Sequence, residues 1–299
     1  MLPATAKMFA LVRDLSSRRE VTEIPVSRWL LERHHLGPLT ALAGAPGLRD
    51  QLARATVRWA ALARELPSLV AQLRAAGVGC APIKGVAYAT SLYDTPAARP
   101  MTDVDLLLEP GTEARAHTAL AAAGFRKLVD IRAHHASTWL RGDLTLDVHR
   151  NILGAGRSRI ALDAVWARTL AGWPAGARRL EPVDELVFHL AHMARNRLCG
   201  PLVQVVDAAR LLERADARAV RARAHDWQIG AMVGAALAFC EAILAGEPLR
   251  SRLAPRETEI LFALQPPLAR KLLFDVATAG SPRQLAARAI GAGFQWLAR

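Results

Sequence analysis

Cysteine, aromatic residues and long apolar runs are all scarce in this chain. Its 299 residues include three cysteines, Cys80, Cys199 and Cys240, which lie far apart and form no CxxC pair. Neither a disulfide framework nor a zinc site is therefore expected, and this cysteine usage fits a reducing cytoplasm. No stretch of about 18 uncharged apolar residues occurs, so no transmembrane helix is expected. The N-terminal residues also lack the pattern of a signal peptide.

Hydrophobic residues are abundant although aromatic ones are few. They make up 52% of the chain, aromatic residues make up 5%, and alanine, leucine and arginine dominate. This composition favours a mostly helical protein, although a genome rich in G and C would bias it in the same direction. The length predicts two or three structural units with a sizeable core.

The net charge is strongly positive. It is +12 at pH 7, and the sequence pI is about 10.9. Such a field attracts polyanions, including nucleoside triphosphates, nucleic acids and acidic membranes. The basic residues are scattered, so an arginine-rich solvated surface explains the charge equally well. A basic amphipathic helix is expected at 282–297, and packing on other helices is favoured for it over docking on a membrane surface.

Three regions differ in their apolar patterns. Residues 1–78 have helical spacing, residues 79–150 alternate strand-like and helix-like runs, and residues 151–299 return to helices. We therefore predict an α+β protein with an N-terminal helical region, a core containing a small sheet and a C-terminal helical domain. In the core we expect the order β-α-β-α-β-β-β at residues 80–84, 85–93, 101–108, 113–123, 125–129, 135–140 and 144–149.

Two acidic residues, Asp103 and Asp105, stand at the head of the apolar run 101–108. Because residues i and i+2 of a strand point to the same side, both carboxylates should project from one face while the intervening residues enter the core. Asp147 lies with matching parity in the later run 144–149. Three carboxylates on neighbouring strands repel one another unless a divalent cation neutralises them, as Mg²⁺ does in nucleotide-transferring enzymes. The alternative is a set of ordinary surface acids at strand starts.

Lys84 and Gly85 occupy the expected junction between the first strand and the helix that follows. A helix N-terminus offers free N–H groups and the positive end of the helix dipole, both suited to phosphate. Glycine lets the backbone approach a ligand closely, and Lys84 would reach a β- or γ-phosphate. The other interpretation is an ordinary turn glycine beside an exposed lysine.

Histidines occur beside the acids and in the helical half. His149 shares the face of Asp147, where it would orient that carboxylate or contact the substrate; a purely structural role is the equal alternative. The pair His134–His135 is expected in a loop, without a catalytic role.

A second pair, His189 and His192, has the i, i+3 spacing of metal ligands on an expected helix, but no third ligand is evident. Packing between helices is therefore favoured for both. In the alternative, one of them lines the nucleotide pocket, because the following helix brings Asp207 and Arg210.

Several segments together resemble one known family, the uncharacterised nucleotidyltransferases of the DNA polymerase-β superfamily, which include nucleotidyltransferases from lasso-peptide gene clusters. The segments that carry the resemblance are 83–93 (IKGVAYATSLY), Pro96, Arg99, 103–107 (DVDLL), Gly124-Phe125 and 146–149 (LDVH).

The C-terminal segments 186–193 and 205–212 are also similar, so the resemblance spans about residues 25–215. Its specific part is the block 83–108. The chain departs from the wider superfamily at Val86, where that superfamily has serine or glycine, so no hydroxyl can contact phosphate there.

The resemblance implies a fold and a set of site residues. The fold would be a small mixed sheet of the polymerase-β type, flanked by N-terminal helices and a larger C-terminal helical bundle. Asp103, Asp105 and Asp147 would bind Mg²⁺ or Mn²⁺, and Asp147 would also serve as the base that draws a proton from the acceptor hydroxyl. Lys84 and Arg99 would neutralise the triphosphate of an NTP co-substrate.

The expected activity is Mg²⁺-dependent transfer of a nucleoside monophosphate from an NTP, most simply ATP, with release of pyrophosphate. Members of the resembling family look like accessory enzymes of peptide-product gene clusters. The expected acceptor is therefore a hydroxyl or carboxylate on a peptide natural product, another small molecule or a protein. A tRNA end, as in toxins that share this core, is the nucleic-acid alternative, and a catalytically silent nucleotide- or RNA-binding protein is the non-enzymatic one. The sequence leaves base preference, oligomeric state and pathway open.

Overall fold

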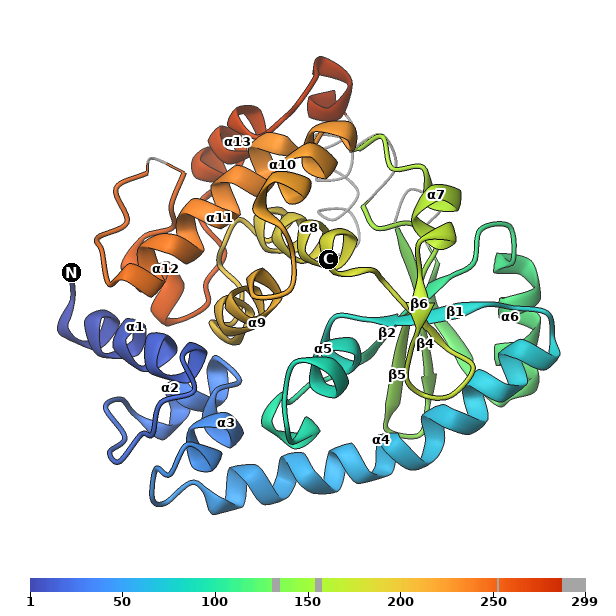
Figure 1. Ribbon diagram of the computed structural model, residues 1–299, viewed down its shortest axis with the longest axis horizontal. Coiled ribbons are helices and arrows are strands. Elements are labelled where there is room, and N and C mark those ends of the chain that lie inside the picture. Colours follow the sequence, from blue (N-terminus) through green and yellow to red (C-terminus); the bar gives the residue numbers. More distant parts are fainter. Residues whose placement is uncertain (131–134, 154–157, 252, 287–299) are drawn as a thin grey trace.

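A five-stranded mixed sheet forms the middle of the chain, and helices pack on both of its faces (Figure 1). The computed structural model describes residues 1–130, 135–153, 158–251 and 253–286. Neighbouring strands follow the order β1-β2-β5-β4-β3. Their bounds are β1 (Cys80–Ile83), β2 (Val104–Leu108), β3 (Arg126–Asp130), β4 (Ala136–Arg141) and β5 (Leu144–His149).

The β2 and β5 strands are parallel neighbours, and the other neighbouring pairs are antiparallel. A parallel pair needs a crossover connection, which here runs through α6 (Glu113–Ala122) and the strands β3 and β4. Between β1 and β2 lie α5 (Gly85–Ser91) and the short 3-10 helix η1 (Pro96–Ala98). The predicted order of strands and helices is thus confirmed.

Four helices precede the sheet: α1 (Pro3–Ser16), α2 (Arg28–Arg33), α3 (Gly37–Leu42) and α4 (Arg49–Ala75). With 27 residues, α4 is about 40 Å long at a rise of 1.5 Å per residue. It extends from the N-terminal helices to the sheet along one side of the molecule (Figure 1). Pro67 lies inside α4, and the helix continues through it.

The C-terminal part is largely helical, as predicted. Its helices are α7 (Leu162–Ala167), α8 (Pro182–Arg195), α9 (Val203–Leu212), α10 (Ala217–Asp226), α11 (Gly230–Ala245), α12 (Glu257–Leu261) and α13 (Leu268–Ala277). Three features of this part were not predicted: α7, α13 and a small hairpin of β6 (Leu170–Ala171) and β7 (Arg178–Arg179). Most of the helix expected at 282–297 lies outside the described residues.

Alternate residues of β2 enter two hydrophobic cores. Val104 and Leu106 pack with α4 and α6, as strand alternation predicts. Leu107, on the opposite side, belongs to a second core that includes α5, α8, α9 and α11. That core also contains α1, so the two ends of the chain share one apolar interior.

This architecture confirms the predicted α+β fold class, with a small mixed sheet between N-terminal helices and a larger C-terminal helical bundle. The three cysteines are buried free thiols. Among the described residues, no helix is both long enough and apolar enough to cross a bilayer.

Candidate active site

Two of the predicted acids lie opposite each other across the parallel pair of strands. Asp105 of β2 and Asp147 of β5 are Cα partners in the register, and adjacent strands are about 4.8 Å apart. Asp103 stands one residue before β2, on the same side as Asp105. Asp105 is buried, with 6% exposure, whereas Asp103 and Asp147 are half-buried. The register therefore places Asp105 and Asp147 on one face of the sheet, and the charges of both act on the nearby Asp103. We call the face with these three carboxylates the acid face.

Each of these carboxylates has one oxygen held by a neighbouring side chain. The Thr102 hydroxyl donates to Oδ1 of Asp103 over 3.2 Å. The Thr138 hydroxyl donates to Oδ1 of Asp147 over 2.7 Å. Oδ1 of Asp105 is held too, and among the described residues no side chain donates a hydrogen bond to the three Oδ2 atoms. The side chains are thus fixed, while one oxygen of each remains open to a further ligand.

Two basic groups meet on the Asp105 carboxylate. Lys84 Nζ donates to Oδ1 over 2.6 Å, and His149 Nε2 donates to the same atom over 2.8 Å. Burial raises the pKa of Asp105, but the Lys84 ammonium and the His149 hydrogen bond outweigh burial and hold that pKa below its ordinary value. His149 is 1% exposed, and its Nδ1 has no hydrogen-bond partner among the described residues.

The electrostatics of Asp103 differ from those of Asp105. Burial raises the pKa of Asp103, and the negative charges of Asp105 and Asp147 raise it further, against a smaller opposing effect of Lys84. The acid face therefore carries more negative charge than its own basic groups compensate. A cation bound there would relieve this repulsion.

The predicted Lys84–Gly85 junction has a tight backbone. Lys84 has φ 52° and ψ −125°, a conformation that costs a residue with a side chain about 1–3 kcal/mol. A Cβ added to Gly85 would lie 3.1 Å from Cβ of Met101, so the start of α5 packs closely against the loop that leads to Asp103. The junction thus holds the Lys84 side chain over the acid face.

Arg99, predicted to bind phosphate, is bound to Asp207 of α9 in this structure. Its Nε and Nη2 lie 2.8 Å from Oδ2 of Asp207, and its Nη1 donates to the carbonyl of Pro100. The Tyr93 hydroxyl donates to the same carboxylate over 2.7 Å. Arg99 is 8% exposed and Asp207 is fully buried. This ion pair joins the loop before β2 to the helical part.

Arg210 belongs to the same buried region. Its guanidinium donates to the carbonyls of Leu92 and Leu15 and lies 4.1 Å from the ring centroid of Tyr93. Asp207 and Arg210 therefore connect buried parts of the helical region and do not line the acid face.

The two histidines of α8 have different surroundings. The ring of His189 makes a hydrogen bond between helices, with its Nε2 2.8 Å from the carbonyl oxygen of Gln204. The pKa of His192 is held well below its ordinary value by burial and then by the charges of Lys84 and Arg195. His192 thus lies near the basic groups of the acid face.

Thr138 and Arg195 also belong to this region and were not identified from the sequence, and His135, expected in a loop without a catalytic role, lies beside them. Arg195 Nη1 donates to His135 Nε2 over 2.7 Å, and the rings of His135 and His149 have centroids 5.0 Å apart. Because a guanidinium only donates, His135 Nε2 is the acceptor in this contact. Arg195 follows His192 by three residues, so both lie on one helix face, and this spacing is the sequence feature that could have indicated Arg195.

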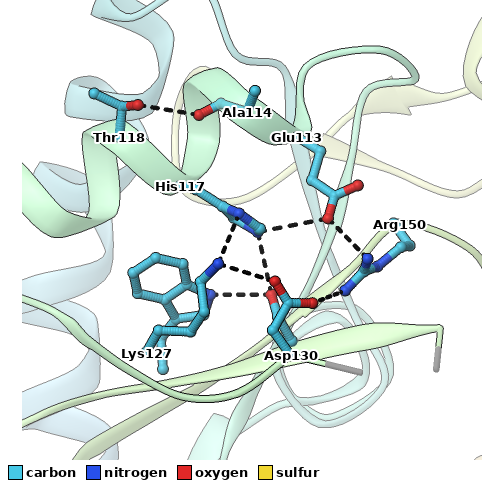
Figure 2. A network of polar contacts seen from close by, with 9 residues as sticks. Glu113, Ala114, His117, Thr118, Lys127, Asp130 and Arg150 are labelled. Carbon is cyan, nitrogen blue, oxygen red and sulfur yellow. Dashed lines mark hydrogen bonds and ion pairs between the residues drawn. The ribbon is translucent and has the colours of Figure 1, made fainter. Parts of the chain in front are cut away.

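A network of ion pairs anchors the chain directly after β5 (Figure 2). Arg150 binds Glu113 of α6 at 3.0 Å and also binds Asp130 at the end of β3. Lys127 Nζ connects Asp130, at 2.9 Å, to His117 Nδ1, at 3.1 Å. These contacts fix the end of β5 against α6, which supports the position of the acid face.

A large cleft opens beside Asp103. Its volume is about 1420 Å³, and it is lined by α4, the segment 96–104 and the β4–β5 hairpin. Leu140 and Thr145, which pair across that hairpin, form its wall next to the acid face. Small-molecule pockets typically have volumes of roughly 300–1,000 Å³, so this cleft has room for two substrates side by side.

The acids suit an open metal site better than a closed one. Within the described ranges, no group of three His, Cys, Asp or Glu side chains is arranged so that it could hold a metal ion, and this includes Asp103, Asp105 and Asp147. Mg²⁺ usually keeps several waters and binds one or two carboxylates together with substrate phosphates. Adjacent carboxylates with one open oxygen each, and the raised pKa of Asp103, fit such a site.

Comparisons with known proteins relate the chain to one family and to two solved structures. The model of a family described as uncharacterised nucleotidyltransferase matches residues 30–245. Among solved structures, the antibiotic-resistance factor ANT(2'')-Ia is similar at 15% identity and a TM-score of 0.39, over 60% of this chain and 95% of its own. An antigenic nucleotidyltransferase-like protein from Paracoccidioides brasiliensis is similar at 15% identity and a TM-score of 0.39, over 62% of this chain and 93% of its own. No curated protein matches the chain.

Proposed function

Because the chain belongs to the uncharacterised nucleotidyltransferase family, we propose that it transfers a nucleoside monophosphate from an NTP, most simply ATP, to a hydroxyl or carboxylate acceptor. The observation that carries the proposal is the pairing of Asp105 with Asp147 across β2 and β5, with Asp103 on the same face. A silent binding protein would have no need of three carboxylates on one face of the sheet.

Asp103, Asp105 and Asp147 are the residues proposed to hold Mg²⁺ or Mn²⁺. A bound ion of this kind supplies positive charge that stabilises the attacking and leaving oxygens of a phosphoryl centre. Thr102 and Thr138 keep the first and third carboxylates oriented through their Oδ1 atoms. His149 serves as a positioning residue for Asp105, because it donates to the Oδ1 atom and leaves Oδ2 open.

The remaining chemistry is a proton transfer and an in-line displacement. The acceptor oxygen forms a bond to the α-phosphorus, the bond to the bridging oxygen breaks, and pyrophosphate leaves. Asp147 takes the acceptor proton through its open oxygen. Lys84 moves from Asp105 to the phosphates, whose negative charge it neutralises. Gly85 permits the close packing of the Lys84 junction that this role requires.

The cleft beside Asp103 is the proposed acceptor site. Among the described residues, three of its five arginines pair with acids: Arg54 with Asp50 at 2.9 Å, Arg99 with Asp207 at 2.8 Å and Arg141 with Glu65 at 3.1 Å. Nucleic-acid binding relies on uncompensated basic groups that contact phosphates. The paired charges therefore favour a peptide or another small molecule as the acceptor over a tRNA end.

The predicted division into residues 1–78, 79–150 and 151–299 stays part of the proposal. In it, the middle unit carries the acids and Lys84, while the helical units supply the supports behind the site. The shared core of α1 with α9 and α11 indicates that the first and third units fold together.

The test uses purified protein, Mg²⁺ and each of the four α-³²P-labelled NTPs, with peptide and small-molecule extracts or RNA as acceptors. Pyrophosphate release and label transfer are measured together. We expect both with one NTP, abolished by Asp103→Asn and by EDTA, and unchanged by Asp163→Asn, which alters an exposed acid of α7.

The outcome also separates the alternatives. Label on RNA, with binding that weakens steeply as salt rises, would replace the small acceptor with tRNA. Absence of pyrophosphate release with every acceptor, together with NTP binding that Asp103→Asn leaves unchanged, would refute the enzymatic proposal in favour of a binding protein.

A further inference from the structure

The last turn of α8 is connected to the acid face through two imidazoles. Arg195 donates to His135 over 2.7 Å, and the His135 ring lies 5.0 Å from the His149 ring. His149 in turn donates to Asp105 over 2.8 Å. This chain of contacts places the Arg195 guanidinium on the helical side of the acid face, opposite the sheet.

Two further basic groups lie beside it. His192 precedes Arg195 by three residues, so both are on one side of α8. Lys84 donates to the same Asp105 oxygen as His149, so the contacts through Asp105, His149 and His135 connect Lys84 to Arg195. None of His192, Arg195 and Lys84 is fully buried, and the Lys84 side chain is 16% exposed.

The charges on the sheet side of the site and on its α8 side suit different parts of a nucleotide. The sheet side carries carboxylates, which repel phosphate unless a cation lies between them. The α8 side carries Arg195, and Lys84 lies between the two sides at the start of α5; both residue types bind phosphate oxygens directly. Nη1 of Arg195 donates to the His135 ring, and this contact limits the rotation of the Arg195 side chain.

We propose that the C-terminal end of α8 binds the β- and γ-phosphates of the nucleotide, with Arg195 as the main ligand and His192 and Lys84 beside it. The proposal rests on the proposed function and assigns the residues that retain the pyrophosphate portion. The α-phosphorus then lies toward the acids, so the bond that breaks is between the two sides. The simpler role for basic residues in a last helical turn is interaction with the helix dipole, which predicts no phosphate binding.

The test is isothermal titration calorimetry with inorganic tripolyphosphate in EDTA, which needs neither metal nor acceptor. We expect the wild-type protein to bind tripolyphosphate. Arg195→Ala should weaken the affinity about tenfold or more. Arg195→Lys should weaken it less, because lysine keeps the positive charge but lacks the bidentate guanidinium. Arg221→Ala removes an equal charge from the exposed face of α10 and should leave the affinity unchanged. Asp103→Asn should bind as tightly as wild type or more tightly, because it removes a repelling charge. Thermal melts check that each variant is folded.

Equal affinities of Arg195→Ala and wild type, or equal losses in Arg195→Ala and Arg221→Ala, would overturn the proposal. Its failure is distinct from failure of the proposed function. NMP transfer that requires Asp103 but is insensitive to Arg195 would refute the α8 site alone. Arg195-dependent tripolyphosphate binding without any nucleotidyl transfer would support the site and refute the enzyme.

Discussion

Nζ of Lys84 lies 2.6 Å from Oδ1 of Asp105, so an ammonium group is hydrogen-bonded to the carboxylate at the centre of the acid face. The side chains of this pair are only 16% and 7% exposed, and screening by salt is therefore weak. A divalent cation that binds Asp105 must overcome the nearby positive charge. If Lys84 moves to the phosphates when a nucleotide binds, metal and nucleotide should bind cooperatively.

Removal of the Lys84 ammonium should strengthen metal binding to the protein without nucleotide, although it weakens nucleotidyl transfer. For Lys84→Met we expect about tenfold tighter Mn²⁺ binding, because the competing charge-assisted hydrogen bond is lost. Free Mn²⁺ is measured by electron paramagnetic resonance. Lys84→Gly is a second variant that suits the positive φ at this position.

The control for this prediction is Lys7→Met, which removes an exposed ammonium from α1. It should leave Mn²⁺ affinity unchanged. Weaker Mn²⁺ binding by both Lys84 variants would mean that Lys84 supports the metal site and does not compete with it.

The Arg99–Asp207 ion pair should be essential for stability. Asp207→Ala leaves the buried guanidinium and the Tyr93 hydroxyl without their acceptor, so the free energy of unfolding should fall by about 3–5 kcal/mol. Urea denaturation measures this change. Asp226→Ala, at an exposed position of α10, should change it by less than about 0.5 kcal/mol. The double variant Arg99→Met/Asp207→Leu should be more stable than Asp207→Ala, and the opposite order would argue against a structural pair.

Glu185 of α8 should make stability depend on pH. It is 5% exposed, and burial raises its pKa to about 7 from the ordinary 4.5, against the opposing charges of Arg179 and Arg214. A carboxyl with a raised pKa binds its proton more tightly in the folded state. Its contribution therefore favours folding at low pH and is lost as the pH rises from about 4.5 to about 7.

Glu185→Gln should remove this dependence. The shift corresponds to roughly 3 kcal/mol, so the variant should gain about that much stability relative to wild type between pH 5 and pH 8. Urea unfolding of both proteins at the two pH values gives the difference. Parallel stability profiles would contradict the assignment to Glu185.

The acid face could be predicted because it depends on local rules. Strand alternation predicts on which face of its strand each of Asp105 and Asp147 lies. The parallel register then brings the two residues together. Thr138 was predictable in principle as well: the two-residue turn 142–143 pairs Arg141 with Leu144, which sets Thr138 opposite Asp147. Hairpin register is fixed by turn length, so the hydroxyl contact was implicit in the sequence.

The partners of the basic residues could not be predicted in the same way. Arg99 and Asp207 are 108 residues apart in sequence, and an arginine in a loop before an acidic motif looks the same whether it binds phosphate or a buried carboxylate. Arg195 and His135 meet only because α8 packs over the sheet. The β6–β7 hairpin has two residues in each strand, too few for any period to be visible.

The central claim is that Asp103, Asp105 and Asp147 together hold the cation that serves the triphosphate. The most direct measurement is an anomalous difference map from crystals grown with Mn²⁺ and a non-hydrolysable ATP analogue. We predict a peak about 2 Å from carboxylate oxygens of Asp105 and of at least one other acid of the triad, beside the phosphates. A bound nucleotide with its metal remote from these three residues would contradict the claim.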